Sequence, residues 1–269
     1  MLEISNVKKR FGRKVVLKGV SLTLGQGVYG LLGPNGSGKT TLMRCVAGVY
    51  RPAAGTIHAP ERVGYLPQRF GMFKQLTVYE AMAYFAALKQ IPARTQRKAI
   101  MECLEQVHLA DRANDRMGAL SGGMVRRVGI AQALLGSPEL ILADEPTAGL
   151  DPEERLRFKN VISNLQGGPT VVISTHIVED VESNCDHIIL LYGGEVLTES
   201  TADALRAQAA GKVFSIPASE RNRLRQPYFL LREDTGAGTL RVLSELPQPG
   251  EPAIPTVEDG YMLYIRSRT

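Results

Sequence analysis

The chain has 269 residues, of which 44% are hydrophobic and 22% are charged, and this composition is typical of a globular protein rather than a disordered or fibrous one. The net charge of +5 is mild, and no basic tail typical of nucleic-acid binding follows the fold. One local basic cluster (Lys8, Lys9, Arg10, Arg13 and Lys14) is interpreted as a solvated face or loop. No apolar run approaches the ~18 residues of a membrane span, which excludes a channel, and the first residues lack the pattern of a secretory signal.

The three cysteines are an odd number at wide spacing. Cys45, Cys103 and Cys185 form no CxxC pair and no Cys/His cluster, so neither a zinc site nor a disulfide framework is supported. Lone thiols of this kind fit a reducing cytosol.

The first third of the chain predicts short strands rich in Val, Leu and Ile, with one early helix that begins near Thr41. We expect strands at 2–7, 15–24, 27–32, 56–58 and 63–66. The pattern becomes helical from about residue 77 to 136, where apolar residues such as Ile100, Cys103, Leu104 and Val107 recur at helical spacing.

Strands return after the helical stretch. We expect strands at 140–143, 170–174 and 187–191 and a helix over 152–165. Alternation of strands and helices favours an α/β fold with a largely parallel sheet covered by helices. The helical stretch, about 70–137, is then a subdomain inserted into a main domain that covers 1–210.

The remaining residues, 211–269, differ in composition. They hold six of the 15 prolines, and strand-like runs alternate with turns at 213–216, 228–232, 240–243 and 261–265. We predict a small β-rich appendage that the chain enters through a helix near 201–210.

A glycine-rich segment joins the strand at 27–32 to the first helix. Gly33-Pro34-Asn35-Gly36-Ser37-Gly38-Lys39-Thr40 matches G-x-x-x-x-G-K-[ST] in full. Glycines permit a sharp turn and close approach to a phosphate, and the following helix N-terminus favours negative charge. In such a loop Lys39 bridges the β- and γ-phosphates and Thr40 offers its hydroxyl to Mg²⁺. The segment therefore predicts a nucleoside triphosphate site.

Two carboxylates end the apolar strand at 140–143. Catalytic side chains gather at the carboxyl ends of parallel strands, so Asp144 and Glu145 are expected beside the phosphate loop. Asp144 can hold Mg²⁺, which prefers oxygen ligands. Glu145 points elsewhere because neighbouring side chains alternate, and it can deprotonate an attacking water.

Further segments narrow the class of nucleotide-binding protein. Leu120-Ser121-Gly122-Gly123-Met124, Gly149-Leu150-Asp151-Pro152 and Ser174-Thr175-His176 follow the phosphate loop in this order, around the strand that ends in Asp144 and Glu145. Over about residues 1–200 the set resembles the ATP-binding subunit of ABC transporters, most closely the ATPases of bacterial exporters. The resemblance implies a P-loop NTPase (RecA-like) α/β fold: a mixed sheet with an antiparallel β edge, the inserted helical subdomain and the β-rich appendage.

The resemblance also implies residue roles, with ATP and Mg²⁺ as the bound groups. The resemblance assigns catalysis to Glu145, His176, Gln68 and Lys39. It assigns the binding of Mg²⁺ to Thr40, Gln68 and Asp144. Nucleotide contacts fall to Phe11, whose ring stacks on adenine, and to Val16, Gly33, Pro34, Asn35, Gly36, Ser37, Gly38, Lys39, Thr40, Thr41, Ser121, Gly122, Gly123 and Asp151. Met124 stands where this family usually has Gln.

In this family Ser121–Gly123 complete the nucleotide site of a second subunit. The resemblance therefore implies a dimer with a second copy or a homologous subunit, together with a separate integral membrane permease, on the cytoplasmic face of the cell membrane. Two other functions stay open: an ABC ATPase that acts on nucleic acid or ribosomes, and a regulatory module that binds ATP without hydrolysis. The weak charge and single cassette disfavour the first, and the intact Lys39, Asp144, Glu145 and His176 disfavour the second.

Overall fold

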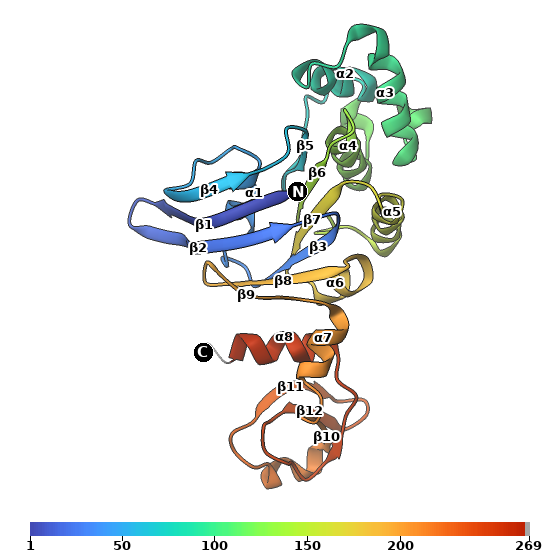
Figure 1. Cartoon of the computed structure of the whole chain (residues 1–269). Coiled ribbons are helices and arrows are strands. Elements are labelled where there is room, and N and C mark those ends of the chain that lie inside the picture. The colour runs from blue at the N-terminus through green and yellow to red at the C-terminus, as the bar shows by residue number, and fades with distance from the viewer. Residues whose placement is uncertain (267–269) are drawn as a thin grey trace. The chain divides into compact units, whose positions relative to one another are not determined.

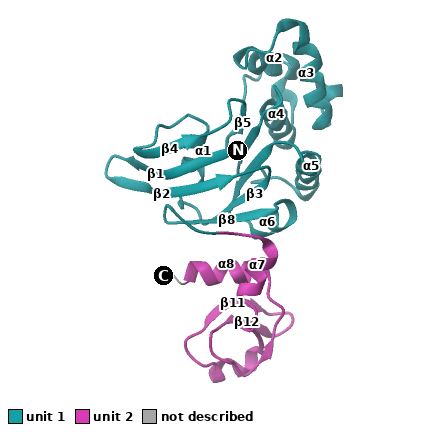
Figure 2. Ribbon diagram, in the orientation of Figure 1, with its two compact units in different colours: residues 1–198 teal, residues 199–269 magenta. Residues whose placement is uncertain are grey.

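The computed structural model describes residues 1–266 and divides into two compact units, Met1–Thr198 and Glu199 onward (Figures 1 and 2). The division falls before the boundary that the sequence suggested at residue 210. The reason is that helix α7 (Ala202–Gln208) packs closely on helix α8 (Val257–Arg266), where a Cβ on Gly260 would lie 2.1 Å from the carbonyl oxygen of Leu205. Helix α7 therefore belongs with the second unit.

A six-stranded sheet with the order β5-β6-β7-β3-β8-β9 forms the centre of the first unit. The strands are β3 (Gly27–Leu32), β5 (Val63–Leu66), β6 (Leu140–Asp144), β7 (Thr170–Thr175), β8 (His187–Tyr192) and β9 (Glu195–Ser200). The pairs β5–β6, β6–β7, β7–β3 and β3–β8 are parallel, as the alternation of strands and helices predicts. Their carboxyl ends therefore meet at one edge, which is where the predicted site residues lie.

The central strands carry continuous apolar runs because both faces of the sheet are covered. In β6, Leu140 and Leu142 pack with helix α1 (Lys39–Val46) on one face, while Ile141 and Ala143 pack on the other. That second core includes helix α5 (Pro152–Ser163) and the helical subdomain. A strand that alternates between two cores needs no polar position, which explains the continuous hydrophobic run. Helix α6 (Val178–Asn184) joins β7 to β8.

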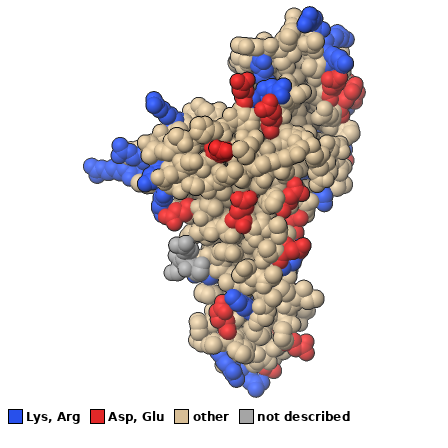
Figure 3. Space-filling view, in the orientation of Figure 1, with Lys and Arg blue, Asp and Glu red and all other residues tan. Residues whose placement is uncertain are grey.

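A second sheet of the first unit is antiparallel, with the order β2-β1-β4. It contains β1 (Leu2–Phe11), β2 (Lys14–Leu24) and β4 (Ala54–His58). The predicted basic cluster lies at the turn between β1 and β2, and Figure 3 shows Lys and Arg side chains gathered where this hairpin projects. The fold is thus the mixed α/β arrangement with an antiparallel edge that the sequence predicted.

The helical subdomain contains α2 (Val78–Leu88), α3 (Ala93–Gln106), α4 (Gly122–Leu134) and the short turns η1 (Ala110–Arg112) and η2 (Met117–Ala119). A capping box begins α2: the Thr77 hydroxyl accepts from the backbone of Glu80, and the Glu80 carboxylate accepts from the backbone of Thr77. Buried residues of the three helices, such as Met82, Ile100 and Val128, share the core of one sheet face. The inserted stretch is therefore packed on the sheet that carries the phosphate loop.

The second unit has a four-stranded antiparallel sheet with the order β11-β12-β10-β13. Its strands are β10 (Val213–Pro217), β11 (Phe229–Asp234), β12 (Thr239–Leu243) and β13 (Glu251–Pro252), with the turn η3 (Ala218–Arg223) after β10. One strand prediction is wrong, because 261–265 belongs to helix α8. A reciprocal pair of hydrogen bonds between Thr256 and Asp259 begins this helix, and a capping box of that kind overrides the strand propensity of the Tyr and Ile residues that follow.

Candidate active site

The phosphate loop connects β3 to α1, as predicted. Gly36 and Gly38 have φ angles of 81° and 109°, a region that glycine enters without the penalty of a Cβ. Gly33 is restricted by space instead, because a Cβ there would lie 2.1 Å from the carbonyl oxygen of Leu191. Glycine at these positions is what allows the backbone to turn and present its N–H groups at the start of α1.

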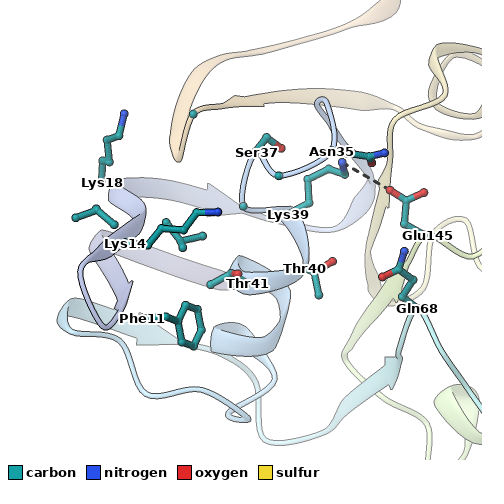
Figure 4. Close-up of a pocket in the computed structure, with 15 residues that line it drawn as sticks. Phe11, Lys14, Lys18, Asn35, Ser37, Lys39, Thr40, Thr41, Gln68 and Glu145 are labelled. Atoms are coloured by element: carbon teal, nitrogen blue, oxygen red, sulfur yellow. Dashed lines mark ion pairs between the residues drawn. The ribbon is translucent and has the colours of Figure 1, made fainter.

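The loop borders a cavity of about 730 Å³. The cavity is lined by Phe11, Lys14, Val15, Val16, Lys18, Asn35, Gly36, Ser37, Gly38, Lys39, Thr40, Thr41, Gln68, Glu145 and Gly193 (Figure 4). Most of these residues were predicted from the sequence. Lys14, Val15, Lys18 and Gly193 were not. Lys14 belongs to the basic cluster, which was interpreted as a solvated face or loop, whereas Val15 and Lys18 lie in the strand predicted at 15–24.

Lys39 lines the cavity and is only 6% exposed. Its Nζ donates hydrogen bonds to the carbonyl oxygens of Gly33 (2.7 Å) and Pro34 (3.3 Å) and lies 3.6 Å from Oε1 of Glu145. Burial lowers the pKa of Lys39 from its ordinary value, while the Glu145 carboxylate opposes that change. An ammonium can exchange carbonyl and carboxylate partners of this kind for phosphate oxygens, so the predicted role of Lys39 at a phosphate stays a prediction.

Asp144 ends β6 and is fully buried. Its Oδ1 accepts hydrogen bonds from the hydroxyls of Thr40 (3.1 Å) and Ser174, whereas its Oδ2 is buried and has no hydrogen-bond partner. An orphaned carboxylate oxygen beside a hydroxyl is a donor set that suits Mg²⁺. The residues present therefore fit the predicted metal, with Thr40 and Asp144 as the groups that would hold it.

Glu145 follows β6 with a left-handed backbone, φ 48°, which is uncommon for a non-glycine residue. Its N–H donates to the carbonyl oxygen of Ser174, and its carboxylate lies between Lys39 and His176, whose Nδ1 is 3.0 Å from Oε2. The side chain of Glu145 is 6% exposed, whereas that of His176, which follows β7, is 44% exposed. Strands β6 and β7 are neighbours, so the two residues meet although they are 31 positions apart.

The opposite side of the cavity carries the predicted base-binding residues. Phe11 is 45% exposed, and its ring meets that of Tyr50 edge-on at a centroid distance of 5.3 Å. The ammonium of Lys9 lies near both rings. Val16 also lines the cavity. An exposed aromatic with one edge supported is suited to stacking on a planar base.

Gln68 follows β5 and is exposed at the rim of the cavity, close to Glu145 in Figure 4. Gly33 and Pro34 do not line the cavity but accept the hydrogen bonds of Lys39. Ser174 is a contact that the sequence reasoning missed: it bonds Asp144 and the backbone of Glu145. Its signal was its place in the segment that ends with His176.

The structure does not bring Ser121, Gly122, Gly123 and Asp151 into this cavity. Ser121 caps α4 and its hydroxyl accepts from the backbone of Met124, while Asp151 caps α5 and accepts from the backbone of Glu154. Ser121, Gly122 and Asp151 are exposed. Exposed helix N-termini can bind phosphate, so their predicted role in the site of another subunit stays a prediction.

The fold and the cavity define a P-loop nucleotide-binding domain. Residues 17–148 match the model of the ABC transporter family. A Nod factor export ATP-binding protein I of Burkholderia lata is 38% identical over 218 residues, which cover 76% of this chain and 72% of that protein. The chain belongs to the ABC transporter ATP-binding proteins.

Other relatives also carry the names of ATP-binding proteins. An uncharacterised ABC transporter ATP-binding protein of Nostoc sp. is 43% identical over 208 residues, and the match covers 72% of this chain but only 62% of that relative. A linearmycin resistance ATP-binding protein of Bacillus subtilis is 34% identical, with coverage of 78% and 72%. The names of two relatives, for Nod factor export and linearmycin resistance, support the predicted likeness to the ATPases of bacterial exporters.

Solved structures confirm the fold. A dimeric bacterial ABC transporter cassette superposes with a TM-score of 0.67 at 29% identity, covering 75% of this chain and 98% of that one. A dimeric post-hydrolysis cassette bound to ADP and phosphate gives the same values. No helix within residues 1–266 is both long and apolar enough to cross a membrane.

Proposed function

We propose that the chain hydrolyses ATP to power a membrane exporter. The observation that carries this proposal is the buried carboxylate of Glu145, which lines the phosphate-loop cavity and contacts both Lys39 and His176. A carboxylate held between an ammonium and an imidazole, beside the phosphate loop, suits a group that takes a proton from water. The export direction rests on the names of the relatives.

Each residue has a separate task in the proposed reaction. The loop backbone and Lys39 bind the phosphates, and Phe11 with Val16 holds the base. Glu145 accepts a proton from the attacking water, while Gln68 and His176 orient the water and the γ-phosphate. Mg²⁺ held by Thr40 and Asp144, with Gln68 reaching toward it, would supply positive charge to the phosphate oxygens.

The proposed motor is a dimer. Ser121–Gly123 are exposed or half-exposed and outside their own cavity, so a second copy or a homologous subunit would receive them at its γ-phosphate, with Asp151 at the seam. ATP then acts as a ligand that favours the closed dimer. Hydrolysis removes the contact between the γ-phosphate and the Ser121–Gly123 segment of the other subunit, so the closed dimer is no longer favoured. Dimeric cassettes among the structural relatives support this arrangement.

The proposed permease contact is the helical subdomain at the cytoplasmic face of the membrane. Phe73, Tyr84 and Leu88 are 74%, 54% and 62% exposed, although they are large and apolar. They lie after the Gln68 loop and on α2. Tyr84 and Leu88 are four residues apart on α2 and therefore share one face of the helix. Large exposed apolar side chains of this kind mark protein interaction sites, which favours this surface for a membrane subunit.

Glu145→Gln tests the proposal. The substitution keeps the shape of the side chain but removes the proton acceptor, so ATP turnover should fall about 10²- to 10⁴-fold while ATP binding persists. Phosphate release with purified chain measures turnover, and size-exclusion chromatography with ATP should show a trapped dimer.

Glu139→Gln is the matched control. Glu139 precedes the same strand, β6, but its carboxylate pairs with Arg62 at the surface, where both side chains are at least half exposed. The control should hydrolyse ATP at the wild-type rate. Wild-type turnover in Glu145→Gln would remove Glu145 from the reaction and overturn the proposed mechanism.

A further inference from the structure

Arg126 lies one turn into α4 and is buried, with only 8% of its surface exposed. Its guanidinium has five N–H donors. All five go to backbone carbonyl oxygens: Nε to Pro146 (3.1 Å), Nη1 to Pro67 (2.7 Å) and Gln68 (3.0 Å), and Nη2 to Asp144 (2.9 Å) and Glu145 (2.8 Å). Every donor is therefore used, and none of these bonds goes to a carboxylate.

The carbonyls of Asp144 and Glu145 belong to the two peptide groups that flank Glu145. Fixing the planes of both peptides fixes the backbone torsions of the residue between them. Glu145 has the left-handed φ of 48° that directs its carboxylate between Lys39 and His176. Strained backbone of this kind persists only where its surroundings hold it, and Nη2 of Arg126 bonds both flanking peptides.

The same geometry is repeated at Gln68. Its flanking peptides carry the carbonyls of Pro67 and Gln68, and Nη1 of Arg126 bonds both. One planar guanidinium therefore fixes the peptides on either side of Gln68 and of Glu145, in loops that follow two neighbouring parallel strands, β5 and β6. The rigid fork of arginine suits such a task, because it holds its donors in one plane at set angles.

We propose that Arg126 is a positioning residue for ATP hydrolysis, which sets the backbone of Gln68 and Glu145 together and links both to the helix that Ser121 begins. This inference rests on the proposed function. It adds a residue that touches neither nucleotide nor water and acts through the two residues that do. A movement of α4 would be transmitted directly to both loops.

The neighbouring Arg127 provides a matched control. It is equally buried, 6% exposed, on the same helix. Its Nη1 donates to the carbonyls of Val107 and His108, and its guanidinium pairs with Glu154. These bonds involve neither Gln68 nor Glu145. A substitution at Arg127 therefore perturbs the packing of α4 without releasing the two loops.

The test compares Arg126→Lys with Arg127→Lys. Lysine keeps the charge but has donors on a single nitrogen, which cannot reach five carbonyls in two loops. We expect Arg126→Lys to lower kcat about 10- to 100-fold at saturating ATP and Mg²⁺, because small misplacements of a reacting group have effects of that size. Its Kd for a fluorescent ATP analogue should stay within about threefold of wild type, since the phosphate loop is untouched, and Arg127→Lys should keep its kcat within the same factor. Thermal unfolding of both variants measures their loss of stability.

A double substitution separates positioning from a general structural effect. If Arg126 acts through Glu145, Arg126→Lys should lower the residual kcat of Glu145→Gln by less than about threefold. Equal kcat in Arg126→Lys and Arg127→Lys would overturn the inference, as would an undiminished effect in the Glu145→Gln background. Arg126→Gln repeats the comparison should the lysine variant not fold.

The outcomes also separate this inference from the proposed function. A large loss of turnover in Glu145→Gln together with wild-type turnover in Arg126→Lys would overturn the inference alone. Wild-type turnover in Glu145→Gln would overturn both, because Arg126 would then have no proton acceptor to position.

Discussion

Asp259 connects helix α8 to the sheet of the second unit, and its removal should loosen that unit specifically. The carboxylate is 2% exposed and accepts from Nε of Arg241 (3.0 Å) and from Nη2 of the same guanidinium. It also accepts from the N–H and the hydroxyl of Thr256. One side chain therefore supports both the start of α8 and its attachment to β12.

The expected cost of Asp259→Ala is about 3 kcal/mol. Breaking a buried ion pair costs ~3–5 kcal/mol when the remaining charge is stranded, and a lost helix cap costs ~1 kcal/mol. The expected cost lies below the sum of these two values, about 4–6 kcal/mol, because Arg241 is 27% exposed and keeps a bond to the carbonyl of Ile254. Its charge can therefore reach water in the variant.

Hydrogen exchange read by mass spectrometry measures this loss locally. A cost of about 3 kcal/mol corresponds to roughly 100-fold faster exchange in peptides of β12 and α8. Asp203→Ala is the control in the same unit, because Asp203 is 93% exposed and pairs with Arg206 on the surface of α7. Exposed ion pairs of this kind contribute little to the free energy of unfolding. Equal exchange in the two variants would refute the reasoning.

The effect of Asp259→Ala should also depend on pH. Burial alone would raise the pKa of Asp259, but the hydrogen bonds from Arg241 and Thr256 outweigh it and the pKa lies below its ordinary value. The carboxylate therefore contributes stability above the pKa of the unfolded chain, ~3.9, and loses it as the pH falls through the folded value. The difference between wild type and variant should shrink in acid. A difference that grows in acid would contradict the assignment.

Two further predictions concern buried titratable groups. Burial lowers the pKa of Lys89 to about 8, so between that value and the ordinary ~10.4 the folded chain binds fewer protons than the unfolded chain. The stability of wild type relative to Lys89→Met should therefore rise from pH 7 to 9.5 in urea unfolding, and a fall would contradict this. Burial raises the pKa of Cys103 to about 11 and also raises the pKa values of Cys45 and Cys185. All three thiols should react slowly with Ellman's reagent at pH 8 until the chain unfolds, and fast labelling of the native protein would refute this.

Local sequence patterns predicted much of the first unit because its strands and its phosphate loop depend on interactions between residues that are close in the sequence. A strand buried on both faces must be apolar throughout, so β6 was readable from Leu140 to Ala143. The phosphate loop was readable because only glycine tolerates φ of 81° and 109° at Gly36 and Gly38. The strand predicted at 261–265 is wrong because the Thr256–Asp259 cap begins a helix there, which outweighs the strand propensity of the apolar residues that follow.

By itself, then, the amino-acid sequence determined the order of the elements of the first unit, the phosphate loop and the two carboxylates after β6. Only the tertiary structure decided that Oδ2 of Asp144 has no hydrogen-bond partner and that Glu145 lies between Lys39 and His176. It also decided that Arg126 joins the loops of Gln68 and Glu145. The physical reason is distance along the chain. These contacts form where parallel strands meet at one edge of the sheet, and no local periodicity records which side chain will face which.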